Sequence, residues 1–196
     1  MTTTAPSART NVDEVALDLV FQLMAGTYRS PSEALRNDVD AGAFGEALAA
    51  LADRLDLPAP ELATLPWVTL QASYVDLFVS SASGVAAPPY VGYAIDDELM
   101  GPSTQLLGAA FADHGIALQD DWHDLPDHVA AVAEGGQHLV RTGRAQAAFD
   151  LLEGFVSPWF ERFAAAIAAK DVSSFYGPVS RFLHDAIREV TRETRP

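Results

Sequence analysis

The chain has 196 residues, of which 49% are hydrophobic, and this is enough for a single domain with a sizeable core. It contains no cysteine, so disulfides, iron–sulfur clusters and thiolate zinc sites are excluded. With 27 acidic and 12 basic residues the net charge is −15, and such a surface repels nucleic-acid phosphates and anionic lipid head groups.

The first part of the chain predicts a short tail followed by one long helix. Residues 1–10 are polar and lack the apolar core of a secretory signal, so we expect a disordered tail ahead of one folded domain at residues 11–196. Apolar side chains recur at helical spacing from Val12 to Met24 and stop before Arg29. No run approaches the ~20 apolar residues of a membrane span, so we expect a cytoplasmic protein without stable membrane insertion.

Two more helices are predicted before residue 66. Ser30, Pro31 and Glu33 occupy the N-cap, the first and the third helical positions of a typical helix start. A later apolar stripe at helical spacing runs from Phe44 to Leu55, and the prolines that follow it end the helix.

The middle of the chain predicts a helix and then an ordered loop. Pro66 is placed to open a helix whose buried face would include Tyr74, Leu77 and Phe78. Residues 85–101 show little helical period and contain much proline, glycine and aspartate, which is typical of a loop.

Another helix is predicted to begin at Pro102. Its inward face would include Leu106 and Phe111, and Gly115 would end it. Residues 120–124 then form a polar linker.

The next helix is predicted to have Asp124 as its N-cap and Pro126 in its first turn, with an apolar face that reaches Val140. Gly135 and Gly136 lie in its middle, where each glycine costs about 1 kcal/mol relative to alanine. We therefore expect a close backbone approach at this pair.

Helical patterns continue to the end of the chain, over residues 144–156, from Ser157 to about residue 169, and onward from Ser173 or Ser174. No stretch shows a sustained period-two alternation of β-branched residues, so no strand is predicted. The predicted fold is therefore all-α, a single globule of roughly eight to ten helices.

The common catalytic signatures are missing. There is no GxSxG elbow, Walker loop, GxGxxG or HExxH, so we expect no enzymatic activity and no cofactor. One alternative is a small metal-dependent enzyme, because two histidines and four aspartates share one short segment, although such acidic linkers are commonly just solvated and we expect no metal. These residues are Asp120, Asp121, His123, Asp124, Asp127 and His128. Another alternative is a helical structural subunit of a larger complex.

A stiff aromatic segment favours binding of a peptide over catalysis. Pro88 and Pro89 fix φ and remove two backbone donors, so their loop presents Tyr90 and Tyr93 with little conformational entropy left to lose. Rigid, partly exposed aromatic side chains are typical of a peptide-binding rim. The alternative is a packed turn between two helices.

Five groups of residues, taken in order, resemble the motifs of the TorD/DmsD/NarJ family of redox-enzyme maturation chaperones. The resemblance covers about residues 12–190. The groups are Tyr74-x-x-Leu77-Phe78, Pro88-Pro89-Tyr90-x-x-Tyr93, Leu99-Met100-Gly101-Pro102, Asp124-Leu125-Pro126-Asp127-His128, and Pro158-Trp159-Phe160-x-x-Phe163 followed by Ser174-Phe175-Tyr176 and Phe182-Leu183. The chain departs from the family after the Asp-His pair, where only Glu134 of the usual run of residues is retained.

The resemblance implies a TorD-like, all-helical, cytoplasmic chaperone rather than an enzyme. Its partner would be the twin-arginine leader, and sometimes the body, of a molybdenum-cofactor oxidoreductase precursor of the DMSO, TMAO or nitrate reductase type. The chaperone would assist cofactor insertion before export, as a monomer or a domain-swapped dimer.

The resemblance also implies where the leader would bind. An acidic protein suits a cationic leader, although an acidic surface adapted to a salt-rich cytoplasm would show the same composition. We expect Asp127, ionised in a first helical turn at the mouth of the groove, to pair with a leader arginine, and His128 to orient it or to donate a bond of its own. The groove implied by the family is lined by Leu77, Phe78, Pro88, Tyr90, Pro126, Asp127 and His128, and the rim adds Pro89 and Tyr93.

Overall fold

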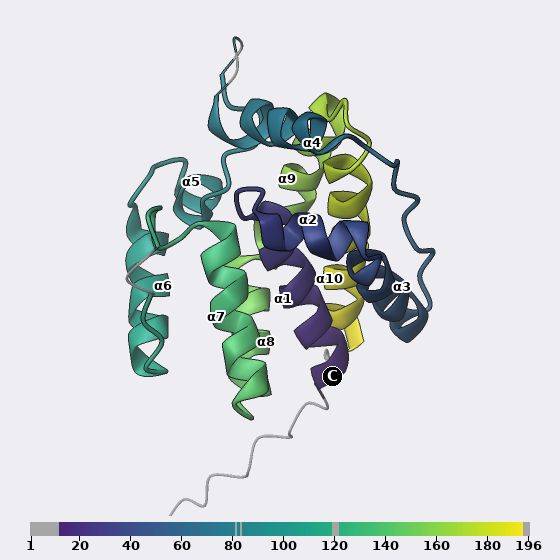
Figure 1. Cartoon of the computed structure of the whole chain (residues 1–196). Coiled ribbons are helices and arrows are strands. Elements are labelled where there is room, and N and C mark those ends of the chain that lie inside the picture. Colours follow the sequence, from purple (N-terminus) through teal and green to yellow (C-terminus); the bar gives the residue numbers. More distant parts are fainter. Residues whose placement is uncertain (1–11, 81, 83, 119–121, 194–196) are drawn as a thin grey trace, which may run out of the picture.

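The computed structural model describes residues 12–80, 82, 84–118 and 122–193, and the tail expected at residues 1–10 lies outside this part of the chain. The described residues form helices and no strand (Figure 1), as the sequence predicts. In chain order they are α1 (Glu14–Tyr28), α2 (Glu33–Asp40), α3 (Ala43–Leu55), α4 (Trp67–Tyr74), the π-helix η1 (Val75–Val79), α5 (Val91–Asp96), α6 (Pro102–Asp113), α7 (Val129–Arg141), α8 (Ala145–Phe155), α9 (Ser157–Lys170) and α10 (Tyr176–Glu193).

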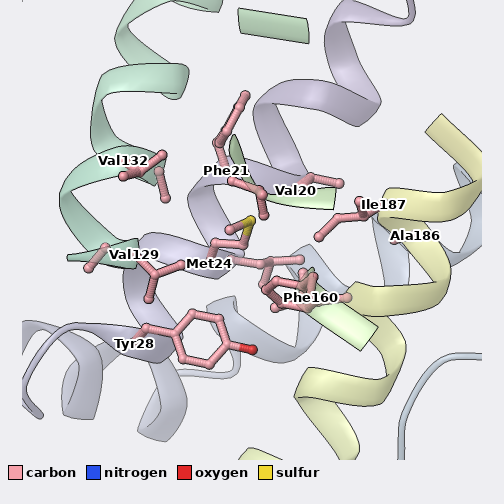
Figure 2. Close-up of a cluster of buried hydrophobic side chains, with 14 of the residues drawn as sticks. Val20, Phe21, Met24, Tyr28, Val129, Val132, Phe160, Ala186 and Ile187 are labelled. Atoms are coloured by element: carbon pink, nitrogen blue, oxygen red, sulfur yellow. The ribbon is translucent and has the colours of Figure 1, made fainter. Parts of the chain in front are cut away.

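The core lies where α1 packs against α7 on one side and α10 on the other. Figure 2 shows Met24 and Tyr28 of α1 beside Val129 of α7, Phe160 of α9 and Ile187 of α10. These side chains are fully or almost fully buried, because these four helices turn their apolar stripes toward one another. No helix of the described part is long and apolar enough to cross a membrane.

The predicted start and end of the first helix are confirmed within two residues. The Asp13 side chain caps α1 by accepting a hydrogen bond from Ala16 N at 3.1 Å, and Arg29, in extended conformation, ends it. The second helix begins two residues later than predicted. Ser32, not Ser30, is its N-cap and accepts a bond from Leu35 N at 3.3 Å. Both serines have the chemistry of an N-cap, so composition alone did not separate them.

Two expectations for the middle of the chain are wrong. Residues 85–101 contain the short helix α5, whose six residues are too few to show a helical period. Leu106 is 63% exposed and does not face inward, although Leu107 and Phe111 of the same helix are buried. The reason is that α6 lies at the outer edge of the molecule and packs on one side only (Figure 1).

The close approach expected at the glycine pair of α7 is confirmed. A Cβ atom on Gly136 would lie 2.4 Å from the ring of Phe21 in α1, and one on Gly135 would lie 2.9 Å from the ring of Phe111 in α6. Both distances are shorter than any real contact of a Cβ atom, so the two glycines let the rings of neighbouring helices lie directly on the α7 backbone.

Candidate functional site

A π-helical turn shapes one wall of the candidate site. At the end of α4 the helix widens into η1, where Ser80 N donates to Val75 O, five residues back, at 2.8 Å. This wider turn buries both Leu77 and Phe78 while Val79 stays exposed. The Leu77 carbonyl accepts a bond from Ala87 N at 3.0 Å, which ties η1 to residues 86–90, the loop with Pro88 and Pro89 that we call the proline loop. Single π-turns often mark functional sites.

Phe78 joins the core to the surface. Its ring packs edge-on against Tyr28 and Tyr176, with centroids 5.9 and 5.4 Å apart, and also contacts Tyr74 and Phe163. The same residue lines a surface groove of about 570 Å³.

This groove gathers most of the residues that the sequence predicts for peptide binding. Six of the nine line it, and Leu99, Asp124 and part of the segment before the proline loop complete its walls. The six are Phe78, Pro88, Pro89, Tyr90, Tyr93 and His128. The remaining three, Leu77, Pro126 and Asp127, do not line it, so the structure brings together the aromatic and proline part of the prediction.

Exposed apolar side chains are frequent in the segments that form the groove. Many of the large apolar side chains that the described structure leaves exposed lie between residues 75 and 100. They are Val75, Val79, Val85, Tyr93, Ile95, Leu99 and Met100. Four of them, Val79, Val85, Tyr93 and Leu99, line the groove itself, and exposed apolar side chains gathered at a groove are typical of an interaction site.

Asp127 does not lie at the mouth of the groove as expected. Its side chain is 0% exposed, and its Oδ2 atom accepts hydrogen bonds from Gly92 N and Thr104 Oγ1, both at 2.8 Å. The expectation was wrong because the chain is not yet helical at this point. The segment from Asp124 instead forms a turn, and α7 begins at Val129.

Asp124, and not Asp127, is the carboxylate that lines the groove. Its side chain is 44% exposed, and its Oδ1 atom accepts bonds from Tyr90 Oη at 3.0 Å and from Leu125 N at 2.7 Å. Burial first, and then the bond to Asp124, raise the pKa of Tyr90 to about 12. Asp124 belongs to the same sequence motif, but an aspartate at this position also fits a helix N-cap, which is the role that the sequence predicts for it.

His128 is the N-cap of α7. Its Nδ1 atom accepts a bond from Ala130 N at 3.1 Å, so the ring is neutral with its proton on Nε2, which lies 3.9 Å from Asp124 Oδ2. The rings of Tyr90 and Trp122 pack edge-on against it, with centroids 5.5 and 5.8 Å away. Burial lowers the pKa of His128 below its ordinary value and outweighs the nearby charges of Asp124 and Asp127, which raise it.

We expect the lowered pKa of His128 to make stability fall as the solution becomes acidic. Well above pH 6.5 the histidine is neutral in both states. Below that pH the unfolded chain binds a proton before the folded one does, so the free energy of unfolding should fall by up to about 1.4 kcal/mol per pH unit until the folded pKa is reached. Urea unfolding at pH 7.5 and 5.5 measures this. His128→Asn, which keeps a capping oxygen but does not titrate, should show a smaller pH dependence, and an equal one would contradict the assignment.

The alternative of a metal site has no support in the described part of the chain. No group of three or more His, Asp or Glu side chains there could hold a metal ion. Asp120 and Asp121, which belong to the predicted group, lie outside the described residues.

A second hollow, which lies beside α1 and α7, was not predicted. It has a volume of about 740 Å³ and is lined by residues of α1, α2, α3 and α7. Glu134 forms an ion pair there with Arg29 at 2.6 Å, and the Arg29 guanidinium also lies over the ring of Trp122, 5.5 Å from its centre. Glu134, the residue retained from the family pattern, therefore does not line the groove of Phe78.

The comparisons with known proteins agree with this fold. The family model of the nitrate reductase delta subunit matches residues 37–165, more than half of the chain. A crystal structure from Archaeoglobus fulgidus, described as a redox enzyme maturation protein, is similar over 94% of this chain and 98% of that chain, with a TM-score of 0.61 and 21% sequence identity. No curated protein sequence matches the chain. Because the family model spans the groove, the proline loop and the start of α7, the chain belongs to the nitrate reductase delta subunit family.

Proposed function

We propose that the protein is a chaperone that matures a molybdenum-cofactor oxidoreductase and binds the twin-arginine leader of its precursor in the groove between η1, the proline loop and α5. Membership of the nitrate reductase delta subunit family supports a partner of the nitrate reductase type and a role in maturation rather than in catalysis. The observation that carries the proposal is a groove with apolar and aromatic walls and one partly exposed carboxylate, Asp124, in its lining.

The walls suit the apolar stretch of a leader. Phe78, Tyr90 and Tyr93 offer aromatic surface, and Pro88 and Pro89 offer a wall without backbone donors. A ligand therefore binds there by burying apolar side chains against rigid rings, which costs little side-chain entropy on the protein side.

Asp124 suits the arginines. Its Oδ2 atom lies 3.9 Å from His128 Nε2, which is longer than a hydrogen bond, and the side chain is 44% exposed. A guanidinium can approach this oxygen while Tyr90 holds Oδ1 in place. The carboxylate would then make a charge-assisted bond to the leader, and the chaperone would hold the precursor in the cytoplasm until the cofactor is inserted.

We expect a peptide with two arginines followed by an apolar segment to bind, and Asp124→Asn to weaken that binding by about 1 to 3 kcal/mol. Asparagine still accepts the bonds from Tyr90 and Leu125, so the fold should be kept. Titration calorimetry at low ionic strength measures the affinity. A peptide with glutamines in place of the arginines should bind the variant and the unchanged protein equally.

The matched control is Asp76→Asn, which removes the same charge from an exposed position of η1 that does not line the groove. It should leave the affinity for the arginine peptide almost unchanged, because a carboxylate outside the groove makes no charge-assisted bond to the bound peptide. Equal losses for Asp76→Asn and Asp124→Asn would show a general effect of charge and contradict the contact. No binding of either peptide to the unchanged protein would contradict the groove itself.

A further inference from the structure

Asp127 is an unusual residue in this molecule. Among the described residues it is the one acidic side chain that is buried, with 0% exposure. Burial of a carboxylate lowers the stability of the fold unless hydrogen bonds compensate for the lost hydration. Its Oδ2 atom accepts two hydrogen bonds, whereas its Oδ1 atom is buried without a hydrogen-bond partner among the described residues. This residue does not line the groove, so its burial needs another explanation.

The bonds of Asp127 connect three helices. The Oδ2 atom bonds to the backbone of α5 through Gly92 N and to α6 through Thr104 Oγ1, both at 2.8 Å. The Asp127 carbonyl oxygen accepts a bond from Val91 N at 3.0 Å, and Pro89 O accepts one from Val129 N at 2.8 Å. The segment before α7 is therefore fastened to the start of α5 by both its side chain and its backbone.

A side chain at position 92 would displace the groups that bond there. A Cβ atom there would lie 2.3 Å from Thr104 Oγ1 and 2.9 Å from Asp127 Oδ2. A glycine at this position thus allows α5 to lie directly against the carboxylate and the hydroxyl.

The helix α5 depends on such bonds. It has six residues, too few to be stable by themselves, and its place is set by what it touches. Tyr90 precedes its first residue and Tyr93 lies within it, so the position of α5 fixes the aromatic wall of the groove.

We infer that Asp127 is a positioning residue for ligand binding, which holds α5 against α6 and α7 and so sets the aromatic wall of the groove without touching the ligand. This inference rests on the proposed function of the groove. It assigns affinity for the apolar part of the ligand to Asp127 and discrimination in favour of arginine to Asp124.

Calorimetry with the arginine and glutamine peptides separates the two roles. Asp127→Ala removes both side-chain bonds, and Thr104→Val removes one of them. In each variant the affinities for the two peptides should fall by the same factor, about tenfold for a bond whose loss costs 1.4 kcal/mol. Thr104→Ser keeps the hydroxyl and should restore the affinity. Asp127→Asn keeps an acceptor oxygen and should bind both peptides within about twofold of the unchanged protein, whereas Asp124→Asn should weaken the arginine peptide alone.

Hydrogen exchange supplies a readout that does not need the peptides. In Asp127→Ala the amides of α5 should exchange faster while those of α1 and α10 keep their protection, because the two lost side-chain bonds join α5 and α6 to Asp127 and involve neither α1 nor α10. If Asp127→Ala does not fold, Thr104→Val gives the same test with one bond removed. Unchanged exchange in α5 for the folded variants would overturn the inference, whether or not the peptides bind.

Two peptide results would also overturn it. A loss of affinity for the arginine peptide alone in Asp127→Asn would show that the carboxylate itself pairs with arginine. Full affinity for both peptides in Asp127→Ala and Thr104→Val would show that the wall does not depend on these bonds. If neither peptide binds the unchanged protein, the proposed function fails, and the exchange of α5 alone then decides whether Asp127 positions that helix.

Discussion

Replacing Phe78 with alanine is expected to lower the free energy of unfolding by about 3 to 5 kcal/mol and to weaken peptide binding as well. The side chain is 4% exposed and contacts four aromatic rings of the core, so its removal leaves a cavity that the rigid rings cannot fill. The same ring lines the groove, so the ligand also loses apolar surface. Urea unfolding and calorimetry on the same preparation measure the two effects.

Leu77→Ala is the matched control, because Leu77 is the neighbouring residue of η1 and is 1% exposed but does not line the groove. It should cost about 2 to 5 kcal/mol in stability and leave the affinity of the folded protein unchanged. A loss of affinity for Leu77→Ala at a temperature where the variant is fully folded would show that the lining of the groove is wrongly assigned. Full stability in both variants would show that the inner face of η1 is wrongly assigned.

The long elements of the fold could be predicted from the sequence because their signals are local. The α1 stripe and its end at Arg29, and the stripe from Phe44 to Leu55, need only helical spacing and a stop. The Gly135-Gly136 pair could be read in the same way, because two glycines in a helix must be offset by a contact elsewhere. The sequence did not say that the contacts would be the rings of Phe21 and Phe111.

The errors lie where distant segments decide the local structure. The α5 helix is held by bonds from Asp127 and α6 rather than by its own six residues. The same bonds keep Asp127 out of α7, because its carbonyl oxygen bonds to Val91 N. A helix start was predicted from Asp124 and Pro126, which have the right chemistry, but the tertiary contact prevailed over the local preference.

The candidate site was predicted better for its apolar residues than for its charged ones. Rigid prolines next to aromatic residues on a surface indicate a binding site. The structure gathers Pro88, Pro89, Tyr90 and Tyr93 in the groove. Asp124 and Asp127 stand three residues apart in one motif, and only the turn between them decides which carboxylate is exposed and which is buried.

Gly136→Ala should lower the free energy of unfolding by about 1 to 3 kcal/mol, although alanine is the better helix former. The added Cβ atom would lie 2.4 Å from Phe21, whose ring is fully buried between α1 and α7 and must shift. Gly108→Ala is the control, because Gly108 also lies inside a helix but has no atom within 4 Å of the added Cβ, and it should gain about 0.5 to 1 kcal/mol. Urea unfolding of both variants shows which substitution lowers the free energy of unfolding and which raises it. In a protein that already carries Phe21→Leu, the further change Gly136→Ala should lower the free energy of unfolding by less than it does in the unchanged protein, because the smaller side chain leaves room for the methyl group. Stabilisation by Gly136→Ala as large as that by Gly108→Ala would show that α1 and α7 can move apart at no cost, and that the glycine is not needed for their contact.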